Sequence, residues 1–229
     1  MQPLLLLHGA IGSSAQFSKL ADQLSGSYKI YAPDLVGHGS REMPATPFSI
    51  KLFAEDVLAF MEREQLENIP VFGYSMGGYV GLYIARHYPE KISKIVTLAT
   101  KFDWNEAISA KEVQMLDPAK IEQKLPTFAE DLKKRHLPND WKEVLFKTAN
   151  MMTTMGRENP LRPEDYAAIN IPALLLLGDR DKMVSVEETM TVYKALPAAS
   201  MGMLPGTPHS IEQVNLDALV FYIEQLMGE

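Results

Sequence analysis

Six short apolar runs alternate with longer amphipathic segments along this chain of 229 residues, and no other feature constrains the fold as strongly. The runs are bounded by Gly, Pro or Asp, which is typical of strands buried on both faces. Alternation of such strands with helices indicates a mostly parallel, doubly wound sheet with helices on both faces. We therefore predict an α/β fold with about six strands, near residues 4–7, 28–32, 71–74, 95–99, 173–177 and 200–204.

The segments between the runs carry helical periodicity. The clearest begins at Ile50, where apolar residues recur at spacings of three and four as far as Met61. Ser49 precedes it and is a residue type that caps helix N-termini. A second pattern ends before Pro89, because proline cannot continue a helix. We predict two further helices, over residues 186–196 and 211–227.

Residues 101–168 interrupt the alternation, because they contain no convincing strand. The segment is charged, helical in pattern and punctuated by prolines. We interpret it as a helical lid inserted within a single domain that spans residues 1–229; the alternative is ordinary helices packed on the sheet edge. The methionines at positions 151, 152 and 155 either line an apolar acyl pocket, since Met adapts to irregular ligands, or pack in the core.

Composition excludes several classes of function. Lys and Arg total 22 and Asp and Glu total 29, for a net charge of −7, which argues against nucleic acid as a partner. There is no cysteine, so disulfides, a thiolate nucleophile and cysteine-ligated zinc are excluded, and the dispersed histidines predict no metal site.

Membrane association is also not expected from the sequence. No stretch approaches the ~20 apolar residues that span a bilayer. Residues 1–8 are apolar but too few for a signal peptide, and they lack its basic flank. We therefore expect a cytoplasmic protein with no membrane partner, an expectation with which the absence of cysteine is compatible.

The strongest local motif is Gly73-x-Ser75-x-Gly77, which lies between a predicted strand and a predicted helix. A serine on such a turn has a strained backbone that exposes its hydroxyl, and the following helix N-terminus favours developing negative charge. The bare motif occurs often by chance, so the strand before it and the helix after it provide the specificity. Ser75 is the candidate nucleophile; the alternative is a serine in a glycine-rich turn.

A serine nucleophile needs a general base, and five histidines are available. His209 is the candidate because it follows the last predicted strand, and the strands of a parallel sheet end at one edge, where Ser75 also lies. We interpret the other four as structural or solvent-facing: His8 and His38 as braces of loops at strand ends, His87 on the helix after the serine, and His136 on a solvated basic face of the lid.

The base in turn needs an orienting acid, and three aspartates compete for this role. Asp179 follows Gly178 directly, at a position where a short polar side chain caps or braces a loop. Asp181 reaches further toward the site. Asp103 follows an earlier strand. These residues by themselves leave the choice open.

The order Ser75, Asp181, His209 resembles that of the α/β-hydrolase fold superfamily. Residues 178–184 are similar to its acid loop, in which the later aspartate usually serves, so the resemblance favours Asp181. The family usually begins with an antiparallel hairpin, whereas here residues 4–7 already match the strand before the oxyanion loop. We therefore expect six strands instead of eight, and a partner subunit on the exposed sheet edge is a hypothesis.

The resemblance also implies an oxyanion hole. His8-Gly9 resembles the family's oxyanion loop, and residues 34–39 resemble a structural loop that usually follows the next strand. One donor would be the backbone N–H of Met76, directly after the nucleophile, and the other that of Ala10. Each such donor contributes roughly 3 kcal/mol of transition-state stabilisation.

The function we expect is a serine hydrolase that cleaves a small carboxylic ester or thioester through an acyl-enzyme on Ser75, with no cofactor. The resemblance allows the same triad to serve carbon–carbon bond hydrolysis, perhydrolysis or a lyase-type reaction of menaquinone synthesis. The lyase-type reaction usually requires an arginine cluster that binds its acidic substrate, whereas Arg135, Arg157 and Arg162 are scattered along the sequence. A further alternative, from a different class, is a ligand receptor that keeps the triad but turns over little.

Overall fold

The six predicted apolar runs form one parallel sheet in the computed structural model, which describes residues 1–228. The strand order is β2-β1-β3-β4-β5-β6, and each neighbouring pair is parallel. This confirms the predicted fold class and strand number. The strands are β1 (Gln2–Leu7), β2 (Tyr28–Tyr31), β3 (Ile69–Tyr74), β4 (Ile92–Leu98), β5 (Ala173–Gly178) and β6 (Ala199–Leu204).

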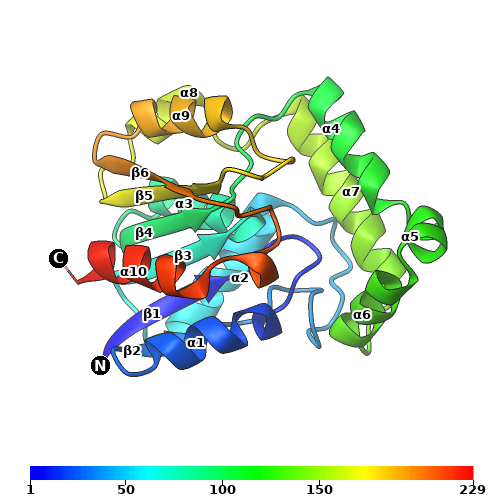
Figure 1. The fold of residues 1–229 in the computed structure, drawn as a ribbon, viewed down its shortest axis with the longest axis horizontal. Helices are drawn as coiled ribbons and strands as arrows, with labels where there is room; N and C mark the ends of the chain where they lie inside the picture. The colour runs from blue at the N-terminus through cyan, green and yellow to red at the C-terminus, as the bar shows by residue number, and fades with distance from the viewer. Residues whose placement is uncertain (229) are drawn as a thin grey trace.

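Helices cover both faces of this sheet (Figure 1). The alternation of side chains along the strands explains why. In β1, Leu5 and Leu7 face one hydrophobic core, while Leu4 and Leu6 face the other, and all four are fully buried. The first core is shared with α2 (Ile50–Arg63), α3 (Met76–His87) and α9 (Val186–Ala195). The second is shared with α1 (Ser18–Leu24) and α10 (Leu216–Met227).

The helix predictions hold for α2, α3 and α9 and need correction at the C-terminus. Ser49 caps α2 as predicted, with its hydroxyl accepting the Leu52 N–H at 3.0 Å. The predicted helix at 211–227 is divided into a short 3-10 turn, η3 (Ile211–Gln213), and α10. Asn215 separates the two because its side chain caps α10 through the Ala218 N–H. The helical stretch formed by η1 (Ser14–Phe17) and α1 was not predicted.

Residues 101–168 contain helices and no strand, as the sequence suggested. Figure 1 shows α4 to α7 together beyond the carboxyl ends of the strands, whereas α8 lies beside α9 on the main body. We call α4–α7 the helical insertion. Part of it has a small core of its own, formed by Ile121, Ala129, Leu132, Trp141 and Leu145. The helices are α4 (Glu106–Val113), α5 (Pro118–Lys124), α6 (Pro126–His136), α7 (Trp141–Arg157) and α8 (Pro163–Ala167), with the 3-10 turn η2 (Gln114–Leu116) after α4.

Within residues 1–228, none of the helices combines the length and the apolar character that crossing a membrane would require.

Candidate active site

Ser75 occupies a sharp turn between β3 and α3. Its φ angle is +51°, a left-handed conformation that costs a non-glycine residue about 1–3 kcal/mol and persists only where the surroundings enforce it. The neighbouring glycines allow the turn because a Cβ at Gly77 would overlap the Leu7 carbonyl oxygen and one at Gly73 would overlap Gly78. The Ser75 N–H is fixed to Leu98 O at 2.8 Å. The hydroxyl is therefore presented at the carboxyl edge of the sheet.

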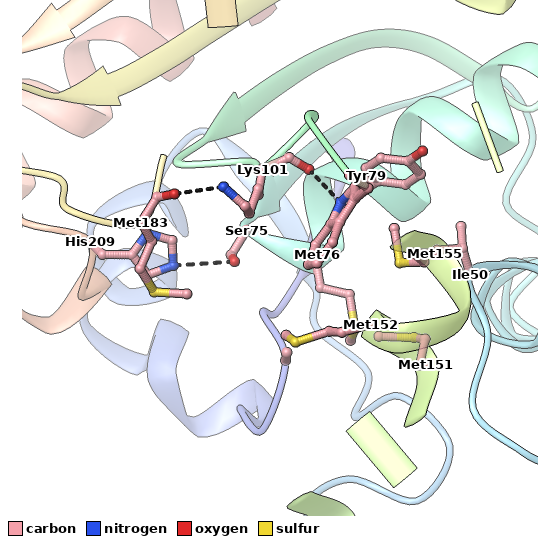
Figure 2. A pocket seen from close by; sticks show the side chains of 12 residues that line it. Ile50, Ser75, Met76, Tyr79, Lys101, Met151, Met152, Met155, Met183 and His209 are labelled. Carbon is pink, nitrogen blue, oxygen red and sulfur yellow. Dashed lines mark hydrogen bonds between the residues drawn. The ribbon is translucent and has the colours of Figure 1, made fainter. Parts of the chain in front are cut away.

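The structure brings Ser75, His209 and Asp181 together in one chain of polar contacts. Ser75 Oγ lies 3.3 Å from His209 Nε2 (Figure 2), and His209 Nδ1 lies 2.8 Å from Asp181 Oδ2. The carboxylate accepts, so Nδ1 carries the hydrogen and Nε2 remains able to take the serine proton. The 3.3 Å separation is within the looser range typical of such pairs without substrate. This arrangement can activate a serine nucleophile.

Asp181 is held so that each carboxylate oxygen has its own partners. Oδ1 accepts the N–H groups of Met183 and Val184 at 2.8 and 2.9 Å, which leaves Oδ2 for His209. Burial by itself raises the pKa of Asp181, but the hydrogen bonds from His209, Val184 and Met183 together lower the pKa below its usual value. The side chain is fully buried and is ionised at neutral pH.

The two other candidate acids lie elsewhere. Asp179 Oδ1 accepts the Thr207 N–H at 3.2 Å and so braces the loop after β6, as its position beside Gly178 suggested. Asp103 is exposed, and its N–H lies 3.4 Å from Glu188 Oε1. Of the three aspartates, only Asp181 contacts His209 in the part of the chain that the structure describes.

Ala10 and Met76 line the same cavity as Ser75 and His209. Met76 is the first residue of α3, where a backbone N–H has no partner within the helix. Ala10 lies inside a turn closed by a hydrogen bond from Gly12 N–H to Gly9 O at 3.1 Å. No hydrogen bond within residues 1–228 occupies the Ala10 N–H. Both amides can therefore donate to a substrate oxygen.

His8 and His38 brace loops, in line with their interpretation from the sequence. His8 Nε2 accepts the Leu35 N–H at 3.0 Å and Nδ1 donates to Gly9 O at 2.8 Å, which ties the loop after β1 to the loop after β2. His38 Nδ1 lies 3.3 Å from Val36 O. His87, as expected, is exposed, and its ring lies against that of Tyr83.

The interpretation of His136 as a solvated lid residue was wrong. The side chain is fully buried and contacts Ile11 O and the Gly39 N–H. The basic run of residues 133–136 suggested exposure, but only part of it faces solvent. A signal was available, because Ala129, Leu132 and His136 recur at helical spacing and are the buried residues of α6.

The cavity beside Ser75 has an apolar wall. Three methionines of α7 supply much of that wall, and Ile50 and Tyr79 add to it (Figure 2). Trp104 also lines the cavity. Sequence reasoning left open whether these methionines line a pocket or pack in the core. They do both, since Met151, Met152 and Met155 line the cavity and are buried.

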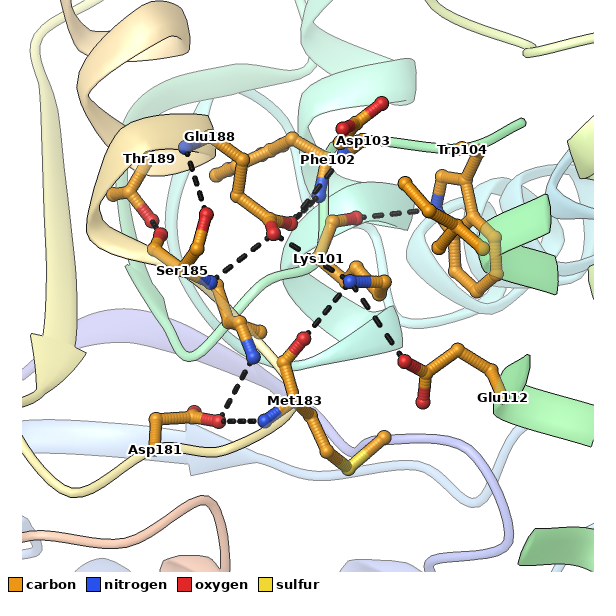
Figure 3. A network of polar contacts seen from close by, with 12 residues as sticks. Lys101, Phe102, Asp103, Trp104, Glu112, Asp181, Met183, Ser185, Glu188 and Thr189 are labelled. Atoms are coloured by element: carbon orange, nitrogen blue, oxygen red, sulfur yellow. Dashed lines mark hydrogen bonds and ion pairs between the residues drawn. The ribbon is translucent and has the colours of Figure 1, made fainter. Parts of the chain in front are cut away.

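Lys101 is a site residue that sequence reasoning missed. Its ammonium donates to Met183 O at 2.8 Å and lies 3.5 Å from Glu188 and 3.9 Å from Glu112 (Figure 3). All three charged side chains are nearly buried. The contacts join the loop of Asp181 to α9 and α4. The available signal was the position of Lys101 at the carboxyl end of β4, on the edge that carries Ser75.

Comparison with known proteins is consistent with the fold described above. The family model for the alpha/beta hydrolase fold matches residues 2–148. Lipase 3 of Moraxella sp. (strain TA144) is 28% identical to the chain, over 91% of the chain and 71% of the lipase.

Solved structures show the same fold at lower identity. A thermophilic esterase from Thermogutta terrifontis matches with a TM-score of 0.77 and 19% identity, covering 98% of this chain and 89% of the esterase. MenH from S. aureus matches with a TM-score of 0.79 and 21% identity, covering 99% and 93% of the two chains. At such identities the likeness concerns the fold alone.

Proposed function

This chain belongs to the α/β-hydrolase fold family, and from that premise we propose that it is a serine hydrolase that cleaves a small carboxylic ester or thioester through an acyl-enzyme on Ser75. The observation that carries the proposal is the polar chain from Ser75 through His209 to Asp181, which opens onto an apolar cavity. No cofactor takes part in the proposed reaction.

The proposed reaction follows from the donors and acceptors of these residues. Ser75 Oγ attacks the carbonyl carbon while its proton passes to His209 Nε2, and Asp181 stabilises the imidazolium. The N–H groups of Ala10 and Met76 stabilise the tetrahedral oxyanion. The intermediate collapses to the acyl-enzyme, and His209 gives the proton to the leaving alcohol or thiol. Water then attacks with His209 as base, which releases the acid and restores Ser75.

The apolar lining of the cavity favours a substrate with an uncharged acyl group. Methionine side chains accommodate irregular apolar ligands without offering charge. Lys101 also lines the cavity, but Glu112 and Glu188 already pair with its ammonium, so it is poorly suited to receive an anion. A small neutral ester fits this environment better than an acidic substrate.

The lyase-type reaction is supported less well, because its acidic substrate calls for an arginine cluster. Arg135 donates to Ile11 O, Arg157 is exposed beside Glu106, and Arg162 precedes α8. None of the three lines the cavity beside Ser75. The expected cytoplasmic location and the partner subunit at the sheet edge stay predictions.

The first test is the substitution Ser75→Ala, assayed with p-nitrophenyl acetate, butyrate and octanoate. We expect kcat to fall at least ~10³-fold, because loss of the nucleophile removes the covalent route. Ser18→Ala, at an exposed serine of α1, is the matched control and should keep wild-type turnover. Undiminished turnover by Ser75→Ala would refute the assignment.

Covalent labelling of Ser75 distinguishes the hydrolase from the alternative of a ligand receptor. A fluorophosphonate reacts with an activated serine whether or not an ester is turned over. Labelling of Ser75 together with turnover supports the hydrolase, whereas rapid labelling without turnover of any ester favours a receptor or an enzyme of narrow specificity.

A further inference from the structure

The last turn of α6 contacts the loop that carries Ala10. Ile11 O accepts two hydrogen bonds from this turn, one from Arg135 Nη1 at 3.0 Å and one from His136 Nε2 at 3.0 Å. The N–H of the same peptide unit, on Gly12, donates to Gly9 O at 3.1 Å. Both polar groups of the peptide that joins Ile11 to Gly12 are therefore held by hydrogen bonds. The helical insertion supplies the partners of the carbonyl.

Ile11 needs such contacts because its backbone is strained. Its φ angle is +53°, in the left-handed region that β-branched residues rarely adopt. A conformation of this kind persists where the surroundings over-determine it. Ile11 also packs against the small core of the insertion. The shape of the loop thus depends on the docked insertion as well as on its own sequence.

His136 can make its contacts in only one protonation state. The Gly39 N–H donates to Nδ1 at 3.2 Å, so Nδ1 carries no hydrogen, and the hydrogen on Nε2 points to Ile11 O. Burial lowers the pKa of His136 to about 4, which keeps the ring neutral at physiological pH. The ring links the loop of Ala10 to the loop that contains Gly39.

Arg135 reaches a second loop of the site. Its Nη2 lies 3.8 Å from Glu212 Oε1, and Glu212 Oε2 accepts the Ser210 hydroxyl at 2.7 Å. Ser210 directly follows His209. One guanidinium therefore contacts the loop that carries the candidate oxyanion donor and is joined to the loop that carries the candidate base.

We propose that Arg135 and His136 are positioning residues for catalysis, and that the Ala10 N–H points at the reacting oxygen only while the end of α6 is docked on Ile11. This rests on the proposed function, since it concerns the oxyanion hole of that same site. A helix that only shielded the cavity would need apolar contacts and would leave the Ile11 carbonyl to water. The insertion thereby completes the site as well as covering it.

The test compares Arg135→Met with Arg135→Lys. Methionine keeps an apolar stem but cannot donate to Ile11 O, so we expect kcat for p-nitrophenyl butyrate to fall about 10- to 100-fold with KM changed less than about twofold. The affinity of a trifluoromethyl ketone, whose serine adduct presents an oxyanion, should fall in parallel. Lysine keeps a charged hydrogen-bond donor and should restore part of kcat.

The matched control is Arg157→Met, at an exposed arginine of the same insertion that pairs with Glu106. It should leave kcat, KM and ketone affinity unchanged. If Arg135→Met raises KM or lowers thermal stability while kcat and ketone affinity stay at wild-type values, the role is structural only and the inference fails.

Hydrogen exchange provides a readout that does not need turnover. In Arg135→Met, but not in Arg157→Met, amide exchange should rise severalfold in the segment that contains Ala10 and Gly12. Unchanged exchange there overturns the inference, even if the wild-type protein cleaves esters. Increased exchange with no Ser75-dependent turnover in the wild type would leave the docking in place and refute the proposed function instead.

Discussion

At the scale of single residues, the geometry of the candidate site depends on the two oxygens of one carboxylate having different hydrogen-bond partners. Asp181 gives one oxygen to two loop amides and the other to His209, so the loop and the imidazole orient each other. An amide side chain would preserve the shape of Asp181 but offers only one acceptor oxygen. Its NH₂ group would face either His209 or the loop amides, and both arrangements lose a hydrogen bond.

We expect Asp181→Asn to lower kcat about 10⁴-fold, because the imidazole then takes the wrong tautomer for accepting the serine proton. Ester turnover with purified variants checks this. Asp103→Asn and Asp179→Asn are the matched controls: the first should keep wild-type kcat, and the second should lose stability, not kcat. An equal loss of kcat in either control would reassign the acid.

Sequence reasoning found those residues whose surroundings are local, and failed where burial depends on docking. Ser75 could be identified because the strand, turn and helix that expose it are contiguous in sequence. His136 could not be placed by its basic neighbours, since the contacts that bury it lie more than ninety positions away, at Gly39 and Ile11. Lys101 was missed because its partners come from three different elements.

At the scale of elements, Lys101 joins segments that the chain order keeps apart. Glu112 comes from α4, Glu188 from α9, and Met183 from the acid loop. Glu188 also accepts the Phe102 N–H at 2.9 Å through its other oxygen. The cluster therefore sets where the first helix of the insertion sits relative to Asp181.

Replacing Lys101 by methionine should lower the free energy of unfolding by about 3–5 kcal/mol, since two nearly buried carboxylates lose their cation. Urea denaturation measures the change. Adding Glu112→Gln to this variant should recover part of the loss, because one unpaired charge is removed. Lys120→Met, at an exposed lysine paired with Asp117, is the control and should change little; a comparable loss there would contradict the prediction.

Element types were more predictable than element limits. The apolar runs identified all six strands, and the pattern was clearest for β3 and β5, which are buried along their whole length. The division between η3 and α10 was not predicted, since the apolar period continues across Asn215 while its side chain ends one turn and caps the next helix. The place of α8 beside α9 depends on tertiary packing that periodicity does not report.

At the scale of the whole molecule, three buried histidines meet where the sheet, the loop after β2 and the insertion come together. The ring of His38 lies 5.3 Å from that of His8 and 5.8 Å from that of His136. Burial lowers the pKa of His8 and of His136 from 6.5 to about 4, and lowers that of His38 well below its usual value. All three are neutral in the folded protein at neutral pH.

Stability should therefore fall on acidification through the window from pH 6.5 to about pH 4. In this window the histidines are protonated in the unfolded chain but remain neutral in the folded protein. The free energy of unfolding therefore decreases as pH falls. The loss is on the order of 3 kcal/mol for each of His8 and His136 across the full window. Urea denaturation at about pH 7 and about pH 4 measures the change in the free energy of unfolding.

His136→Gln is the comparison for this pH effect, because glutamine retains a donor and an acceptor but does not titrate in the window. The variant should show a smaller difference in stability between the two pH values than the wild-type protein. An equal difference would assign the acid sensitivity to other groups.

The small core of the insertion has a consequence for exchanging parts between relatives. Because Ile121, Ala129, Leu132, Trp141 and Leu145 form a small core of their own, α5–α7 resemble a module that a chimera could replace in order to alter the proposed acyl selectivity. Under the positioning role proposed for Arg135 and His136, the replacement would have to present an arginine and a histidine at the end of its equivalent of α6, because the Ala10 N–H would otherwise be misdirected. The contact between the end of α6 and the loop of Ile11, and not the lining of the new pocket, thus decides whether such a chimera is active.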